Sequence, residues 1–476
     1  MKRTLYIIAG VILMITACTK DLEELNVDPK NPSTAPSYAL FTNAQRALTN
    51  TLSSSNINLN IFRLIVQHWN TTQYPDESNY DLGNRTINDN LWDAMYRDVL
   101  RDLQEAKNLI PNDVPDAAVQ QNQLAMVDIM QVYTYYYLVT TFGNIPYTEA
   151  LDIDNPFPKY DDAATIYTDL LSRLDADIAA LNDAAAGIGS ADLIYGGDIA
   201  SWRRFANSLK LKMGMTIADS DPATARTVVE SAVAGGVFTS NADNAVLVYQ
   251  GAPPNTNPIW VDLVQSGRDD FVIASPIATK LDSLNDPRID NFMTPGPGGQ
   301  YVGAAPGSLA AYAQFSHVNP TITAPAFPGL LLDYAEVELL LAEAVERGFA
   351  VGGTAAEHYN AGVTASITYW GGTPAEAAAY LAQPGVSYAT AGGGDFRQKI
   401  GLQKWFALYN RGWDAWIEWR RLDAPNLAPS VDAISAIPVR YPYPVNEQNV
   451  NRANFEEAAT AIGGDNVETK LWWDTR

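Results

Sequence analysis

The sequence predicts a mostly α-helical protein: a tetratricopeptide-like scaffold of helical pairs with a loop-rich insert that forms a recognition surface. Helical periodicity repeats along most of the 476-residue chain. Consecutive periodic segments are joined by short loops, as in tetratricopeptide units, although the WxxLG signature is absent. Between about residues 238 and 328, Gly and Pro become frequent and helical spacing is mostly lost, which predicts the insert.

The predicted helices follow one another along the chain, and several end at Gly or just before Pro, as helices commonly do. Two pairs are separated by so few residues that we expect them to pack as antiparallel hairpins. These pairs are Trp202–Ala218 with Pro222–Gly235, and Leu331–Glu346 with Ala355–Trp370. The other predicted helices are Tyr38–Leu52, Trp92–Leu109, Val119–Phe142, Ala163–Leu181 and Gln398–Arg421.

The segment Gln398–Arg421 is the most aromatic of the predicted helices. At 100° per residue its apolar side chains fall on one face, namely Leu402, Trp405, Leu408, Tyr409, Trp413, Trp416 and Trp419. The opposite side carries two Arg–acid pairs at i,i+3 spacing, formed by Arg411, Asp414, Glu418 and Arg421. A stripe with so many rings needs a large partner surface, so we predict that it lies in the core. Trp92 and Tyr96, one helical turn apart, are also interpreted as core residues.

The N-terminus has the pattern of a bacterial lipoprotein signal. Lys2 and Arg3 precede an apolar run, and Ile15-Thr16-Ala17-Cys18 matches a lipoprotein cleavage site. We predict that residues 1–17 are removed and that Cys18 becomes the lipidated first residue. The alternative is an ordinary signal peptide with an incidental cysteine. The apolar run is shorter than the roughly 20 residues that a membrane-spanning helix needs.

Residues 18–36 contain three prolines and are expected to form an extended tether, followed by a single domain over residues 37–476. The chain has 54 acidic and 31 basic residues, so nucleic acid is a poor candidate partner. Removal of Lys2 and Arg3 with the signal would change the formal charge from −23 to −25. Since Cys18 is the only cysteine, no internal disulfide is expected.

Signatures of catalysis or cofactor binding are absent from the sequence. The three histidines have no HExxH or other metal-ligand spacing, and no GxSxG, GxGxxG or GxxxxGK[ST] motif occurs. We therefore expect no metal, no cofactor and no enzymatic activity. A glycosidase with a pair of Asp or Glu residues remains an alternative, because such a pair is assembled by the tertiary fold.

Two loop-rich blocks carry the candidate ligand contacts, and we expect them to lie together on one face of the scaffold. Aromatic rings can stack on the apolar faces of sugars, while amides, carboxylates and Arg bond to hydroxyl groups; peptides can use the same side chains. The alternative is that each aromatic merely fastens its loop to the scaffold. The first block contributes Trp69, Asn70, Gln73, Tyr74 and Tyr80, and the insert contributes Trp260, Arg268, Asp269 and Tyr301.

Seven motifs occur in an order that resembles the SusD/RagB group of surface lipoproteins, in its SusD-like branch with an N-terminal NPN-type motif. They are LNVDPKNPS at Leu25, FGNIPYTEAL at Phe142, WRRFANSLKLKMGM at Trp202, LNDPRIDNFMTP at Leu284, LDYAEVELLLAEAVERG at Leu332, IPVRYPYPVNEQNVNRANFEEA at Ile437 and GGDNVETKLWWDTR at Gly463. The motifs are spread from Leu25 to Arg476, so the resemblance covers essentially the whole mature chain.

The resemblance implies a lipid-anchored outer-membrane protein that faces the cell exterior and has no enzymatic activity. Such a protein captures an oligosaccharide or an oligopeptide and delivers it to a SusC-like TonB-dependent transporter. Two other classes remain as alternatives: a surface hydrolase that degrades the same polymer, and a purely structural partner of the transporter.

The lipid anchor is tested by Cys18→Ser, which we expect to abolish acylation and to release the protein from membranes. The measurement is fractionation of cells that lack the transporter partner, so that only the anchor retains the protein. Wild-type amounts of the variant in the outer membrane would contradict the prediction.

Overall fold

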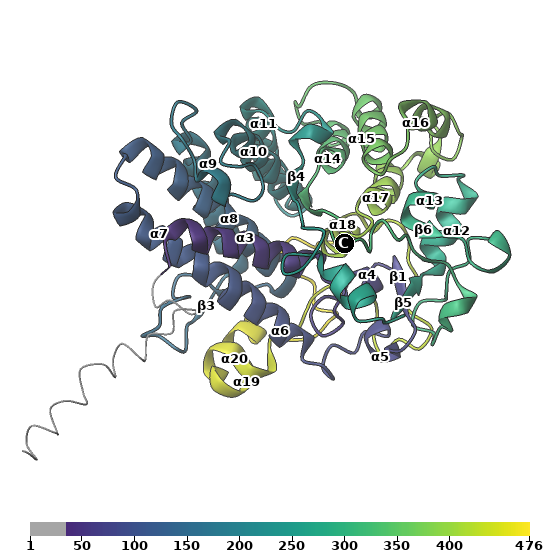
Figure 1. Ribbon diagram of the computed structural model, residues 1–476, viewed down its shortest axis with the longest axis horizontal. Helices are drawn as coiled ribbons and strands as arrows, with labels where there is room; N and C mark the ends of the chain where they lie inside the picture. The colour runs from purple at the N-terminus through teal and green to yellow at the C-terminus, as the bar shows by residue number, and fades with distance from the viewer. Residues whose placement is uncertain (1–34) are drawn as a thin grey trace, which may run out of the picture.

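The computed structural model describes residues 35–476, which form stacked helices with a loop-rich region at one end (Figure 1). The predicted signal peptide, Cys18 and most of the tether lie outside the described residues. Across residues 35–476, no helix combines the length and the apolarity needed to cross a membrane.

Helix α8 (Ala117–Phe142) is the central helix of the N-terminal half. Its first turn is capped by the side chain of Asp116, which accepts hydrogen bonds from the N–H groups of Ala118 and Val119. Every side chain of α8 from Ala125 onward is buried, as expected of a helix surrounded by partners. Helices α7 (Arg101–Asp113) and α9 (Ala163–Ala180) both contact α8, and α3 (Ser37–Ser53) packs against α7.

The two predicted hairpins are present with boundaries close to those expected. They are α10 (Ile199–Thr216) with α11 (Pro222–Gly235), and α14 (Tyr334–Glu346) with α15 (Ala355–Tyr369). A glycine lets the two helices of each hairpin approach closely. A Cβ atom on Gly214 would lie 2.8 Å from Val229 Cγ2, and one on Gly362 would lie 2.8 Å from Leu339 Cγ. The predicted scaffold of helical pairs is therefore confirmed.

The Trp-rich segment is not the single helix predicted from its periodicity. It forms α17 (Phe396–Ala407) and α18 (Gly412–Leu422), and the chain turns between them at Asn410, where φ is 70°. Asn tolerates this left-handed conformation, so the chain can reverse without a glycine at that position. The predicted burial is confirmed for Trp405, Trp413 and Trp416, each at most 3% exposed.

The predicted helix Trp92–Leu109 also differs in detail. The structure has α6 (Ile87–Asp93), a π-helical segment η1 (Ala94–Leu100), and then α7. Apolar spacing does not reveal a π-helix, because the segment stays helical and only its hydrogen-bond step widens. Trp92 is buried, as predicted, whereas Tyr96 is only partly buried.

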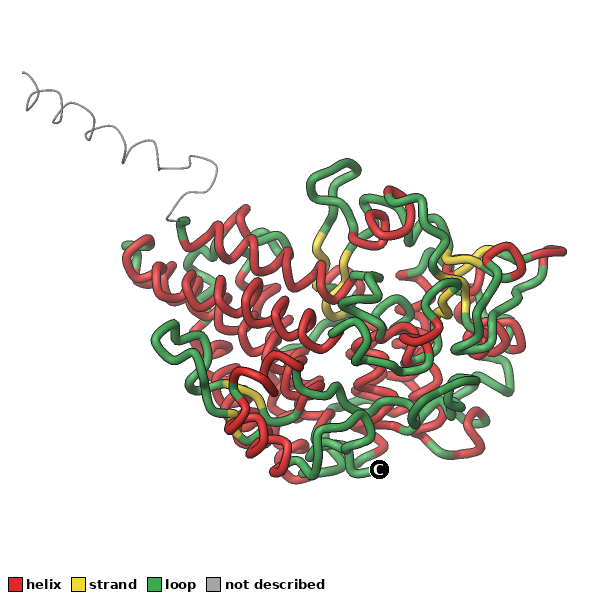
Figure 2. The backbone as a smooth tube through the Cα atoms, turned by 90° about the horizontal axis from the view of Figure 1, so that it is seen from below, coloured by secondary structure: helices red, strands yellow, loops and turns green. Residues whose placement is uncertain are grey.

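The insert leaves the scaffold and returns to it at one place. Strand β4 (Ala245–Leu247) near its start pairs with β8 (Gly329–Leu332) just after its end. Figure 2 shows that loops and short strands dominate this part of the chain. The remaining helices are α4 (Phe62–Ile65), α5 (Pro75–Ser78), α12 (Ser275–Ser283), α13 (Ile289–Phe292), α16 (Pro374–Leu381), α19 (Val445–Val450) and α20 (Arg452–Ala461).

The charged side of the Trp-rich segment is buried as completely as its aromatic side. Glu418 accepts hydrogen bonds from Lys404 Nζ and Arg421 Nη2, both at 2.5 Å. Arg421 also bonds to both carboxylate oxygens of Glu343 on α14. Burial opposes the ionisation of Glu418, but Arg421 and Lys404 outweigh it and lower the pKa of Glu418 to about 2.

Trp416→Ala is expected to lower the free energy of unfolding by roughly 3–5 kcal/mol, as for other large core truncations. The Trp416 side chain has no exposed surface, and its indole N–H donates to the carbonyl of Pro438 at 2.6 Å. Chemical denaturation measures the loss. A variant that kept its stability but lost ligand or partner affinity would show that this ring serves a functional surface.

Glu418→Gln is expected to cost about 3–5 kcal/mol at pH 7, because it leaves Lys404 buried without its counter-charge and removes one of the two carboxylates that bind Arg421. The folded-state pKa is depressed, so the stability supplied by this carboxylate is complete above its ordinary value of 4.5 and is lost as the pH falls toward 2. The difference in unfolding free energy between wild type and variant should therefore shrink in acid. The exposed Glu457→Gln is the control, and a difference that stayed constant between pH 7 and pH 3 would refute the assignment.

Candidate functional site

The two loop-rich blocks lie together, as the sequence predicts. Strand β1 (Trp69–Thr71) of the first block pairs antiparallel with β5 (Phe271–Ile273) of the insert. Just beyond β1, the Thr72 N–H donates to the Asp270 carbonyl at 2.9 Å, and its hydroxyl donates to the Asp269 carbonyl at 2.5 Å. Segments about 200 residues apart in sequence thus form one surface.

Three predicted ligand contacts are buried, and the structure corrects their role. Trp69, Asn70 and Tyr80 are each at most 1% exposed, so they have no free face for a ligand. The indole N–H of Trp69 donates to the Tyr409 hydroxyl at 3.0 Å. Asn70 accepts from the Gly307 N–H and donates to the Ser308 carbonyl, both at 2.9 Å, and Tyr80 accepts from the Ser430 N–H at 3.2 Å. These side chains fasten the loops to the scaffold.

The other candidates in this area reach the surface. Gln73, Arg268 and Asp269 are exposed, and Tyr74 is half-buried. The guanidinium groups of Arg85 and Arg268 lie over the Tyr74 ring, at 5.0 and 5.6 Å from its centre. Such cation–π contacts hold the ring in a fixed position.

Arg268 and Asp269 border an open hollow of about 330 Å³ within the insert. Tyr312 and His317 also line it, and their rings stack at 3.8 Å with only 7° between their planes. The hydroxyl-bearing residues Thr294 and Thr323 also line the hollow. The other lining residues are Leu263, Val264, Asp270, Phe271, Val318 and Pro320.

Asp270 contributes a carboxylate oxygen that has no partner within the protein. Its Oδ2 accepts from Arg268 Nε at 2.7 Å, whereas the buried Oδ1 makes no hydrogen bond among the described residues. A buried acceptor without a partner costs about 1–3 kcal/mol. The Oδ1 atom has almost no exposed surface, so the role of Asp270 at the hollow is to hold the Arg268 guanidinium beside it.

The Tyr312 hydroxyl is a donor at neutral pH. Burial raises the pKa of Tyr312, and the nearby Asp269 carboxylate raises it further. The hollow therefore offers an aromatic pair, a hydroxyl donor, a guanidinium and the exposed carboxylate of Asp269. This combination suits a polyhydroxylated ligand with apolar ring faces.

Trp260 and Tyr301 do not line the hollow. Trp260 begins the π-helical segment η4 (Trp260–Gln265), whose Leu263 and Val264 do line it. The Tyr301 hydroxyl donates to Asp290 on α13. Both side chains are half-buried, and their predicted role in binding stays a prediction.

Asp270, Tyr312 and His317 were missed by the sequence analysis. Tyr312 lies on a one-turn helix η6 (Tyr312–Gln314), and His317 begins β7 (His317–Val318), which pairs with β6 (Met293–Thr294). Asp270 adjoins the predicted Arg268 and Asp269, and this adjacency is the one sequence signal that could have found it.

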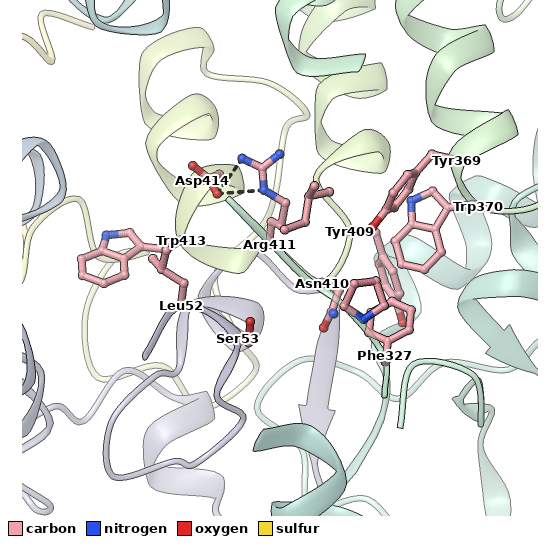
Figure 3. A pocket seen from close by; sticks show the side chains of 12 residues that line it. Leu52, Ser53, Phe327, Tyr369, Trp370, Tyr409, Asn410, Arg411, Trp413 and Asp414 are labelled. Carbon is pink, nitrogen blue, oxygen red and sulfur yellow. Dashed lines mark hydrogen bonds and ion pairs between the residues drawn. The ribbon is translucent and has the colours of Figure 1, made fainter. Parts of the chain in front are cut away.

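A second concavity, drawn in Figure 3, is a narrow slot that Asn410 helps to line. The rings of Phe327, Trp370 and Tyr409 gather on one side, and Arg411 bonds to Asp414 on the other. Its free space is about 20 Å³, enough for roughly one water molecule and far too small for a sugar ring. Over residues 35–476, no group of three or more His, Cys, Asp or Glu side chains could hold a metal ion.

Comparison with known proteins identifies the family. The family model for SusD-like proteins, described as starch-binding and associating with the outer membrane, matches residues 29–444. The chain belongs to the SusD-like family. The family resemblance seen in the sequence motifs is thereby confirmed. No curated protein matches the chain.

Solved structures of SusD-like proteins share the whole fold. A chitin-binding protein is 28% identical with a TM-score of 0.81, covering 92% of this chain and 100% of its own. A SusD homologue from Bacteroides uniformis is 27% identical with a TM-score of 0.79, at 92% and 100% coverage. A chitin-binding SusD homologue from Flavobacterium johnsoniae is 25% identical with a TM-score of 0.76, at 91% and 99% coverage.

Proposed function

We propose that this SusD-like protein is a non-enzymatic, lipid-anchored surface protein that captures a glycan in the hollow of its insert. It faces the cell exterior and delivers the glycan to a SusC-like TonB-dependent transporter in the outer membrane. The observation that carries the proposal is the stacked pair of Tyr312 and His317 in a hollow that the exposed side chains of Arg268 and Asp269 border. The starch-binding description of the family and the chitin-binding titles of two similar structures support a sugar ligand.

The shape of the hollow suits capture followed by release. It is open and bordered by exposed side chains, so a bound glycan keeps much of its surface in water. Binding that removes little surface from water is of moderate strength and quickly reversible, as a carrier requires. An oligopeptide is the second candidate ligand, because the same aromatic and charged groups could hold it.

A hydrolase is the main alternative, and one carboxyl pair in the scaffold has the protonation states that it would need. Burial and the neighbouring Asp128 raise the pKa of Asp177 to about 9, while Arg173 and Lys107 keep Asp128 ionised against the effect of burial. Both carboxyl groups are less than 9% exposed, and Asp128 accepts two hydrogen bonds from Arg173, at 2.7 and 3.0 Å. A substrate has no access to this pair, which favours binding without catalysis.

Tyr312→Ala is expected to weaken glycan binding by about 1–3 kcal/mol while the melting temperature stays nearly unchanged, because a half-buried stacking ring is removed. Asp269→Asn should also weaken binding, since it replaces the exposed carboxylate beside the hollow with a neutral amide. Tyr74→Ala and Trp260→Ala test the two remaining predicted aromatics in the same way. Calorimetry with chitohexaose and maltohexaose, alongside thermal melts, provides the measurement.

Tyr388→Ala is the matched control, because this half-buried tyrosine lies outside the hollow and bonds to Glu346. Unchanged affinity in both Tyr312→Ala and Asp269→Asn would place recognition elsewhere. A large fall in melting temperature would show that the tyrosine supports the loop.

A further inference from the structure

A second groove lies at the other end of the molecule from the hollow. It runs along η1 and α7 under the loop between β2 (Ile145–Pro146) and β3 (Tyr160–Asp161). Figure 1 shows α7 and β3 at the end opposite to β1 and β5. Two adjoining hollows, of about 690 and 430 Å³, share Gln104, Asn108 and residues 150–152 in their walls. This size is typical of sites that hold small molecules.

Side-chain amides form a series along the groove. Gln131 Nε2 donates to Gln104 Oε1 at 3.2 Å, and Gln104 Nε2 donates to Asn108 Oδ1 at 3.1 Å. The series ends where Asn108 Nδ2 donates to Glu105 at 3.3 Å. Each amide nitrogen carries two N–H groups, and Gln104 and Asn108 use one each in this series. The second N–H of these two solvent-accessible amides is therefore available to a ligand hydroxyl.

Aromatic rings and apolar side chains form the other wall. Trp92 and Tyr96 pack at 4.8 Å, and the Tyr96 hydroxyl is fixed by donating to the Pro146 carbonyl at 2.6 Å. The π-helical segment η1 carries Tyr96 at the groove, and such segments occur frequently at functional sites. Across the groove, Ile153 is 84% exposed, which is unusual for a large apolar side chain in an ordered loop.

The groove carries no net charge on a strongly acidic protein. Four cationic and four anionic side chains line it: Arg97, Arg101, Lys107 and Arg173, and Asp102, Glu105, Asp152 and Glu447. The whole chain, by contrast, has a formal charge of −23. A neutral ligand with many hydroxyl groups suits this lining, because neither an anionic nor a cationic ligand would meet a surplus of opposite charge.

We propose that this groove is a second binding site, specific for neutral oligosaccharides and independent of the hollow in the insert. Its amides bond to hydroxyl groups, and Tyr96 and the loop at Ile153 cover the apolar faces of the sugar. Two sites at opposite ends of one chain would hold a long polysaccharide by two contacts. The second contact is then favoured by its high effective concentration.

The test is isothermal titration of the full, detergent-solubilised chain with chitohexaose and maltohexaose, and with an oligogalacturonate of the same length as the charged comparison. We expect two sites for at least one neutral sugar and no binding of the oligogalacturonate in the groove. The double substitution Gln104→Ala/Asn108→Ala should weaken one site by about tenfold or more, because two amide hydrogen bonds are lost. Asn112→Ala, an exposed amide on the same helix outside the groove, should change neither site.

Combined substitutions distinguish binding in the groove from binding in the hollow. In the Tyr312→Ala background the groove site should persist, and adding Gln104→Ala/Asn108→Ala should weaken it by about tenfold or more. Unchanged stoichiometry and affinity in the groove double variant, or no binding of either neutral sugar, would overturn the proposal. If the hollow is not a binding site, Tyr312→Ala and the wild type will give the same titration, which distinguishes this outcome from a failure of the groove.

Discussion

Arg411 is the point at which the helices of the scaffold are held together. Its guanidinium donates to Glu336 on α14 at 2.7 Å, to Asp414 on α18 at 3.0 Å and to the Leu331 carbonyl of β8 at 2.8 Å. Lys212 on α10 lies 3.0 Å from the same Glu336, and the Tyr137 hydroxyl on α8 donates to Asp414 at 2.6 Å. Charges buried this deeply cost several kcal/mol each unless every partner is in place, so four helices can meet here in one arrangement only.

The recognition surface depends on this arrangement through β8. The carbonyl that Arg411 binds belongs to the strand that pairs with β4 and so closes the two ends of the insert. From that base, buried anchors such as Trp69 and Asn70 fix the loops, and exposed side chains such as Arg268 are free to meet a ligand. Because the loops can vary in sequence while the scaffold stays rigid, one fold can bind many different ligands.

Periodicity predicted α8, α10 and α11 to within three residues at each end, because their helical spacing and end signals are clear. It did not reveal the break at Asn410, nor that Arg411 finds a partner on α14 and Glu418 one on α17, since spacing within one helix says nothing about its neighbours. In the loops, composition predicted that the two blocks form one surface, but it could not distinguish buried residues that anchor a loop from exposed residues that could contact a ligand. Trp69 is buried and Tyr74 is only half-buried, although both lie in the same loop-rich block. Asp270 comes close to Tyr312 and His317 because β5, which follows it, packs beside β7, with the Ile273 N–H bonded to the Ser316 carbonyl.

A crystal structure of the protein with bound chitohexaose would show directly whether a glycan binds in the hollow of the insert. We expect a sugar ring against Tyr312 and His317, with its hydroxyl groups within hydrogen-bonding distance of the Arg268 guanidinium or the Asp269 carboxylate. Sugar bound elsewhere on the protein, with the hollow of the insert empty, would contradict it.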